Sequence, residues 1–139
     1  MMQMVRRGFG IFAIALCAIA ATRSASVAAD ANFAGTWVIA GTISNPAGGE
    51  YIQPTCTFKV DGKALSGSCV GPHGMGSVDG SVDGDTIVFN YDRIATSDVS
   101  RDAKLTFRGQ VDSSGVLRGQ WKDSTIEDTV GVFVGLKKQ

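Results

Sequence analysis

The sequence predicts an all-β protein, an eight-stranded antiparallel up-and-down barrel (a meander) with one disulfide. Beyond the N-terminal segment, short runs of alternating apolar and polar residues are separated by Gly, Asp and Ser, and no run has helical spacing over three turns. Eight strands with one apolar face each would leave two exposed edges in an open sheet, and closure into a barrel removes both. A two-sheet sandwich is the alternative fold.

Residues 1–29 are expected to be a secretory signal peptide. Arg6 and Arg7 precede an apolar run over residues 9–21, which is shorter than the roughly 20 residues that a membrane-spanning helix needs. Small residues allow cleavage after Ala29, which we favour, or after Ala20. The mature protein is therefore expected to be exported, to the periplasm or the extracellular medium, and to have no membrane span.

Residues 30–139 are expected to form one domain with a modest core. Without the signal peptide, 10 basic residues remain against 13 acidic ones, a net charge of −3. Lysine and arginine are dispersed along the chain rather than clustered, which argues against a nucleic-acid partner.

The cysteines predict a single disulfide. Cys17 leaves with the signal peptide, and a lipid anchor on it is disfavoured because the large Leu16 precedes it. The remaining pair, Cys56 and Cys69, lies in a chain expected in an oxidising compartment. A metal site is the alternative, but His73 is the only histidine and the spacing is not that of a zinc site. We therefore expect no metal and no cofactor.

In chain order, residues 35–41 form the first predicted strand and residues 56–69 the first hairpin. A four-residue loop over residues 61–64 sets a register in which three pairs point inward: Val60 with Leu65, Phe58 with Gly67, and Cys56 with Cys69. The alternation of apolar and polar residues and the pairing of the two cysteines each predict this register independently. By the loop-entropy model, the crosslink should stabilise the fold by about 3 kcal/mol.

The acidic stretch over residues 76–89 is predicted to be a strand and its turn. It repeats the first hairpin, and the position of Asp85 is there occupied by Lys63, which a calcium site would not tolerate. Calcium is the alternative, although the D-x-D-x-D-G spacing is absent. The predicted inward pairs are Val82 with Ile87, Gly80 with Phe89, and Val78 with Tyr91.

The third hairpin covers residues 105–121, and the last strand covers residues 130–136. In the hairpin, Val111 should face Leu117, Gly109 should face Gly119, and Phe107 should face Trp121. In the last strand three valines and Leu136 share one face, so Phe133 either follows a bulge or covers an outer patch.

Residues 45–54 and 90–103 are expected to be polar connections, the second a lid or a simple loop. Inward glycines at positions 67, 80, 109 and 119 should relieve crowding and let strands bend.

Gly35-Thr36-Trp37 resembles the G-x-W opening of lipocalins and of the avidin family, in which the first strand supplies a tryptophan that closes the barrel floor. The eight-strand rhythm is also similar to the avidin meander. The avidin pocket needs several tryptophans, whereas only Trp37 and Trp121 are present here, so the resemblance implies a barrel without implying biotin binding.

Residues 35–41 with Cys56 and Cys69 are also similar to secreted bacterial inhibitors of alkaline metalloproteases. That family blocks the protease zinc with an extended N-terminal segment, which cleavage after Ala20 would leave longer. The pattern as a whole resembles short exported bacterial β-barrel proteins of unassigned function.

An enzyme is not expected. His73 stands alone in a turn, no serine lies in a G-x-S-x-G elbow, and the consecutive Glu127 and Asp128 would point apart on a strand.

The leading prediction is an exported binding protein for a small apolar ligand in or at the mouth of the barrel; a protein partner is also considered. The alternatives are a protease inhibitor and a structural or interaction module with a filled barrel. The predicted ligand-lining or core residues are Trp37, Phe58, Phe89, Tyr91, Phe107 and Trp121.

Overall fold

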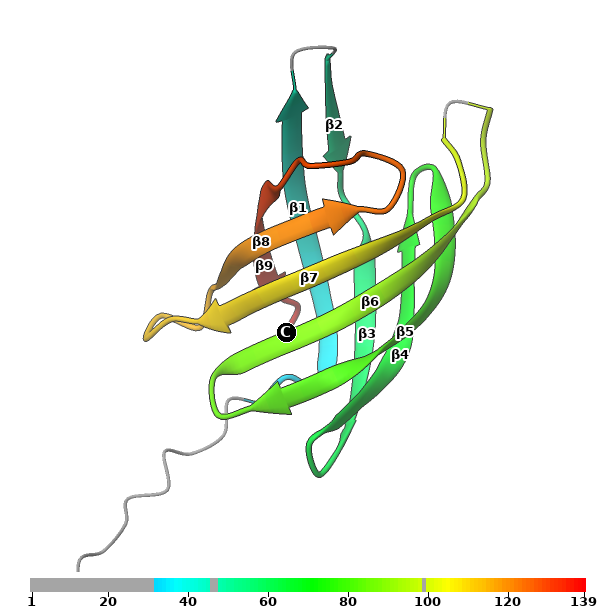
Figure 1. Cartoon of the computed structure of the whole chain (residues 1–139). Helices are drawn as coiled ribbons and strands as arrows, with labels where there is room; N and C mark the ends of the chain where they lie inside the picture. Colours follow the sequence, from blue (N-terminus) through cyan, green and yellow to red (C-terminus); the bar gives the residue numbers. More distant parts are fainter. Residues whose placement is uncertain (1–31, 46–47, 99) are drawn as a thin grey trace, which may run out of the picture.

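The computed structural model describes residues 32–45, 48–98 and 100–139, which contain nine antiparallel strands (Figure 1). Their bounds are β1 (Gly35–Asn45), β2 (Gly48–Ile52), β3 (Thr55–Asp61), β4 (Ala64–Gly71), β5 (Gly74–Asp83), β6 (Thr86–Ala95), β7 (Ala103–Val111), β8 (Leu117–Asp123) and β9 (Gly131–Lys137). Strand order follows chain order from β3 to β9, as in the predicted meander.

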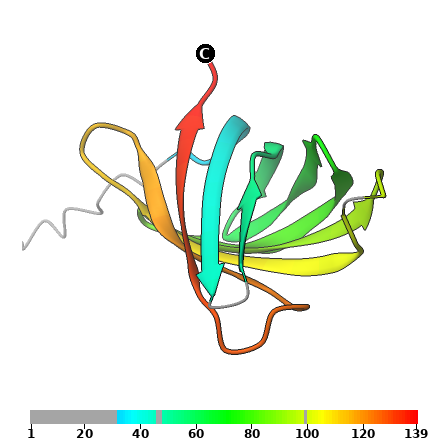
Figure 2. The same ribbon diagram turned by 90° about the horizontal axis from the view of Figure 1, so that it is seen from above.

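The sheet closes because β1 pairs with β9 along one edge and with β3 along the other. Figure 2 shows β1 and β9 running side by side. The prediction of a closed eight-strand antiparallel barrel is therefore confirmed, with β2 as an additional strand.

Strand β2 corrects the expectation that residues 45–54 are only a connection. The first half of β1 pairs with β3, and its second half extends further and pairs with β2 over Gly41–Asn45. Alternation continues through β2, where Ile52 is buried and Tyr51 is exposed. Among the strands of the described residues, β2 therefore forms an edge strand that pairs with β1.

The three predicted hairpin registers are all confirmed. Val60 pairs with Leu65, Val82 with Ile87, and Val111 with Leu117. The acidic stretch is thus strand β5 with its turn into β6. Asp83 at its end forms an exposed ion pair of 3.4 Å with Lys63.

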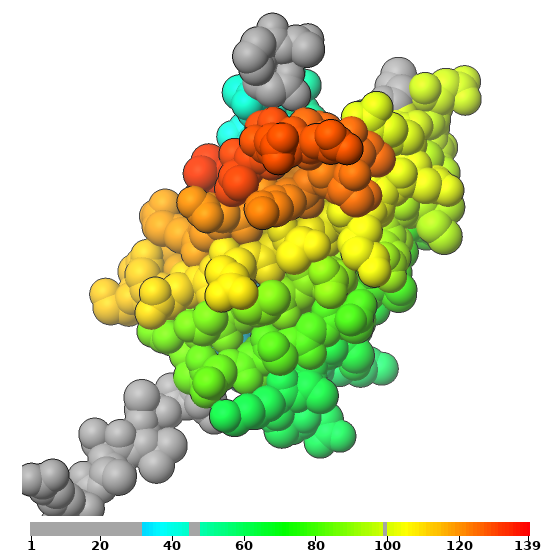
Figure 3. All heavy atoms as spheres, in the orientation of Figure 1, coloured from blue at the N-terminus to red at the C-terminus, as the bar shows by residue number. Residues whose placement is uncertain are grey.

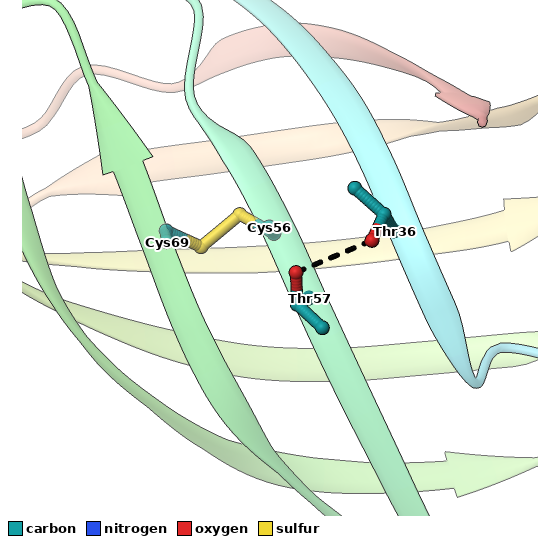
Figure 4. The surroundings of a disulfide bond; sticks show 4 residues. All are labelled: Thr36, Cys56, Thr57 and Cys69. Carbon is teal, nitrogen blue, oxygen red and sulfur yellow. Dashed lines mark hydrogen bonds between the residues drawn. A yellow bond between two sulfur atoms is a disulfide. The ribbon is translucent and has the colours of Figure 1, made fainter.

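The disulfide between Cys56 and Cys69 is confirmed and joins directly opposite residues of β3 and β4 (Figure 4). Both cysteines are fully buried. Next to them, the Thr36 and Thr57 side chains of β1 and β3 make a 3.3 Å hydrogen bond. The crosslink is therefore part of the inner face, and hydroxyls occupy the neighbouring outward positions.

The expected connection over residues 90–103 is shorter than predicted. Strand β6 continues to Ala95, where Met75 pairs with Ile94 and Gly74 with Ala95.

The outer faces of β7 and β8 are polar as expected, with Arg108 opposite Gln120 and Gln110 opposite Arg118. Figure 3 shows these strands as adjacent yellow and orange bands.

Both expectations for Phe133 in strand β9 are wrong, because β9 pairs with β1 and β8 without a bulge and Phe133 does not lie on the outer face. Phe133 is 2% exposed and points inward, whereas Val132 is 61% and Leu136 56% exposed. Gly131 and Gly135 share the inward face with Phe133 because Trp121 and Leu117 leave no room there: a Cβ on Gly131 would lie 2.4 Å from Trp121 Nε1. One large ring between two glycines fits this space, and a row of valines does not.

Trp121 connects three strands at the closure. Its Nε1 donates to Thr42 O on β1 and to Val132 O on β9, both at 3.2 Å. Gly41 on β1 and Gly131 on β9 provide the space for the indole. The pairing of the first and last strands therefore depends on this buried ring.

Reduction of the disulfide should lower the free energy of unfolding by about 3 kcal/mol, because the unfolded chain regains the entropy of a 13-residue loop. Urea unfolding of oxidised and reduced protein measures the difference. Equal midpoints would show that the crosslink contributes nothing to stability.

Gly131→Ala should destabilise the barrel by about 1–3 kcal/mol, because the new methyl would overlap the Trp121 indole and Thr42 O. Gly71→Ala is the matched control, since its Cβ would meet nothing closer than 3.6 Å. Urea unfolding of both variants tests this, and equal stability of the two would contradict the proposed role of the glycine.

Candidate functional site

The end of the barrel where β1 begins is closed by Trp37. Its Nε1 donates to Phe33 O at 2.9 Å, and the two rings are 6.2 Å apart. Lys137 Nζ lies 5.9 Å from the Trp37 ring centroid and donates to Asn32 O. Trp37 therefore has the position that the G-x-W resemblance implies.

The middle of the barrel is filled by aromatic rings. Phe89 lies 5.0 Å from Phe58 and 4.6 Å from Phe107 between ring centroids, and Phe107 lies 6.0 Å from Trp121. Phe133 adds an edge-on contact to Phe107 at 5.2 Å. Such pairs contribute roughly 0.5–1.5 kcal/mol each beyond the area they bury. This buried aromatic cluster is the core of the domain.

A cavity of about 800 Å³ lies at the opposite end, which we call the mouth. It is lined by β2, the β4–β5 turn, the β6–β7 loop and Ile126. These segments lie at the upper end of the barrel in Figure 1. Ile52, Tyr91 and Leu105 supply apolar wall, and His73, Ser100 and Arg101 supply polar wall.

Arg93 on β6 is the buried cation at the mouth, with 8% of its surface exposed. Its Nη1 donates to Glu50 Oε1 of β2 at 2.8 Å, and its Nε donates to Arg101 O at 3.2 Å. Its Nη2 is 3.6 Å from Asp123 Oδ2 of β8, too long for a good hydrogen bond. We call Glu50, Arg93 and Asp123 the mouth triad.

Asp123 is held from its other side by Thr125. Its Oδ1 accepts the Thr125 N–H at 2.8 Å and the Thr125 hydroxyl at 2.6 Å. Burial raises the pKa of Asp123, but the neighbouring Glu50 carboxyl group and the hydrogen bonds from Thr125 outweigh it and leave the pKa below its usual value. The two hydrogen bonds from Thr125 therefore favour the ionised form of Asp123.

Three buried side-chain atoms of the described residues lack a hydrogen-bond partner: Glu50 Oε2, Asp123 Oδ2 and the Tyr91 hydroxyl. A buried polar group left unpaired costs about 1–3 kcal/mol. Burial raises the pKa of Glu50, and the neighbouring Asp123 carboxyl group raises it further, against the lowering effect of Arg93. Burial likewise raises the pKa of Tyr91. Two of the three atoms, Glu50 Oε2 and Asp123 Oδ2, belong to carboxyl groups that both face Arg93, so much of this unfavourable burial is concentrated at the mouth triad.

All six predicted ligand-lining or core residues are buried, and only Tyr91 among them lines the mouth cavity. Sequence reasoning missed the mouth triad, although alternation carried a signal. Arg93 comes two residues after the inward Tyr91, and Asp123 comes two residues after the inward Trp121. Charged residues continuing an inward series predict a buried charge cluster.

His73 occupies a two-residue turn between β4 and β5, where its Nδ1 lies 3.0 Å from Ser97 Oγ. Within residues 32–45, 48–98 and 100–139, no group of three or more His, Cys, Asp or Glu is arranged to hold a metal ion. The same residues contain no helix with the length and apolarity to cross a membrane. The predicted signal peptide and its two cleavage points lie outside the described residues.

No protein-family model matches the sequence, and no curated protein sequence matches it. The closed eight-strand meander is consistent with lipocalin-like and avidin-like folds.

Arg93→Met should destabilise the protein by about 3–5 kcal/mol, because it leaves two carboxyl groups buried without their cation. We expect the lower end of this range, since the Glu50 side chain is 23% exposed and can reach water. Arg108→Met, at an exposed position of β7, is the control. Equal urea midpoints for the two variants would contradict a structural role of the mouth triad.

Proposed function

We propose that this protein is an exported, non-enzymatic binding protein that holds a small, mainly apolar ligand in the mouth cavity. The observation that carries the proposal is a cavity of about 800 Å³ beside a filled barrel. Small-molecule sites have volumes of roughly 300–1,000 Å³ and mainly apolar walls with a few polar groups. Because aromatic rings fill the middle of the barrel, the ligand is placed at the mouth rather than in the interior.

The arrangement of charge supports an apolar ligand over an anionic one. Each nitrogen of Arg93 already faces a protein acceptor: Glu50, Asp123 or the Arg101 carbonyl. Two of its nitrogens donate hydrogen bonds, to Glu50 and to the Arg101 carbonyl, and the third faces Asp123 at 3.6 Å, so a ligand carboxylate or phosphate would compete with these protein groups. The accessible apolar surface along the cavity comes mainly from Tyr51 and Pro72, with a smaller share from Ile126.

The neutral fluorescent probe N-phenyl-1-naphthylamine should bind the mature protein and gain emission in the mouth cavity. Gln53→Trp, which adds a large ring to the cavity wall, should weaken binding roughly tenfold, equivalent to about 1.4 kcal/mol. Lys59→Trp, at an exposed position of β3 outside the cavity lining, is the matched control. Fluorescence titration measures both affinities.

If the probe does not bind, or if both tryptophan variants bind it as the wild type does, the mouth cavity is not an apolar ligand site. Thermal unfolding with and without the probe provides an independent readout, because a ligand that binds only the folded state raises the melting temperature.

A further inference from the structure

We propose that Glu50 and Asp123 share one proton between Glu50 Oε2 and Asp123 Oδ2, and that loss of this proton releases the β1–β2 hairpin and widens the mouth cavity. We call the shared proton, together with the β1–β2 hairpin that it holds in place, the latch. Its regulatory meaning depends on the proposed function, since the latch controls access to the ligand site. The latch itself is a property of the protein without ligand.

The shared proton is inferred from two oxygens of the mouth triad that lack a hydrogen-bond partner. The two unpartnered oxygens, Glu50 Oε2 and Asp123 Oδ2, belong to carboxyl groups that both face Arg93. Neither oxygen is exposed to solvent. A proton on Glu50 Oε2 that is donated to Asp123 Oδ2 provides a partner for both atoms at once. It also makes the triad neutral, with one cation and one anion.

Glu50 is the member that carries the proton. Asp123 Oδ1 accepts two hydrogen bonds from Thr125, which stabilise the ionised form of Asp123. Glu50 Oε1 accepts from Arg93 alone. The directions of the two pKa shifts agree with this assignment, since that of Glu50 is raised and that of Asp123 is lowered.

The groups that face Glu50 come from two strands across the mouth. Arg93 is on β6, and Asp123 is on β8. The other titratable and charged side chains along the cavity are Tyr51 on β2, Tyr91 on β6, His73 on the β4–β5 turn, and Asp98 and Arg101 on the β6–β7 loop.

Strand β2, which carries Glu50, is an edge strand that pairs with β1. The Glu50 to Arg93 hydrogen bond therefore ties the β1–β2 hairpin to strand β6. When Glu50 loses its proton to solvent, two carboxylates share one guanidinium in a buried place. Their repulsion and hydration then favour movement of the hairpin away from the barrel.

The sign of the pH dependence follows from the raised pKa of Glu50. A carboxyl group whose folded-state pKa lies above its ordinary value of 4.5 stabilises the closed state at low pH and loses that effect as pH rises through the folded-state value. Asp123 acts oppositely, because its contribution is lost as pH falls below its ordinary value of 3.8. The latch holds at pH values between the folded-state pKa of Asp123 and that of Glu50, and it opens as the pH rises above the pKa of Glu50.

Glu50 and Glu127 are the only glutamates in the sequence, which makes the test sharp. Mature protein labelled with ¹³C at the glutamate side-chain carboxyl gives two signals, and Glu127, exposed in the β8–β9 connection, supplies the internal reference. Glu50 should titrate above 4.5. In step with this titration, amide hydrogen exchange at Glu50 and Ile52 should accelerate roughly tenfold relative to Glu50→Gln at the same pH.

Glu50→Gln is the informative variant because its amide N–H donates to Asp123 at every pH and keeps the hairpin closed. Asp123→Asn is the second variant, and it should lower the pH at which Glu50 titrates. A Glu50 signal that titrates at or below 4.5, or strand β2 exchanging alike in wild type and Glu50→Gln, overturns the latch.

Titration with N-phenyl-1-naphthylamine below and above the Glu50 transition separates the two proposals. Probe binding that changes between the two pH values in the wild type but not in Glu50→Gln supports gating. Equal binding at both values, with exchange that does change, overturns gating. Absence of binding at both values overturns the proposed ligand site, while the titration and the exchange data still decide the latch.

Discussion

Closure of the sheet between its first and last strands is the constraint on which the rest of the structure depends. Strand β1 must pair with β3 on one edge and with β9 on the other, and the Trp121 indole hydrogen-bonds to the carbonyls of Thr42 and Val132 at this junction. Closure removes the free edges of the barrel wall and defines an inside. Once the inside exists, Phe133 must point into it, and the valines of β9 must point out.

The two ends of the barrel differ because β1 is longer than the strands it pairs with. At its start, Trp37 and Phe33 pack across the opening and fill it. At its far end, β1 runs past β3 and turns back as β2, so the wall rises above the aromatic core without a row of rings to fill it. The cavity at the mouth follows from this difference in length.

Charge is buried at this same end. A buried ion pair is weak evidence for stability, because desolvation offsets most of the attraction, but it does determine which surfaces meet. Arg93 joins an edge strand to the barrel wall through Glu50, where few other contacts compete. The stable part of the molecule is thus the aromatic core with its disulfide. The part suited to local opening is the β1–β2 hairpin at the mouth. Its motion would change access to the proposed ligand site.

The sequence by itself determined the all-β class, the three hairpin registers and the disulfide pair, because these depend on neighbouring residues and a strict period of two. Alternation also marked Phe58, Phe89 and Trp121 as inward. Only the tertiary structure decided the facing of β9, the existence of β2 and the meeting of Glu50, Arg93 and Asp123. Period two assigns a residue to a face, but the stagger of a closed barrel decides which residues of distant strands reach the same height. Glu50 and Arg93 are 43 residues apart and meet for that reason.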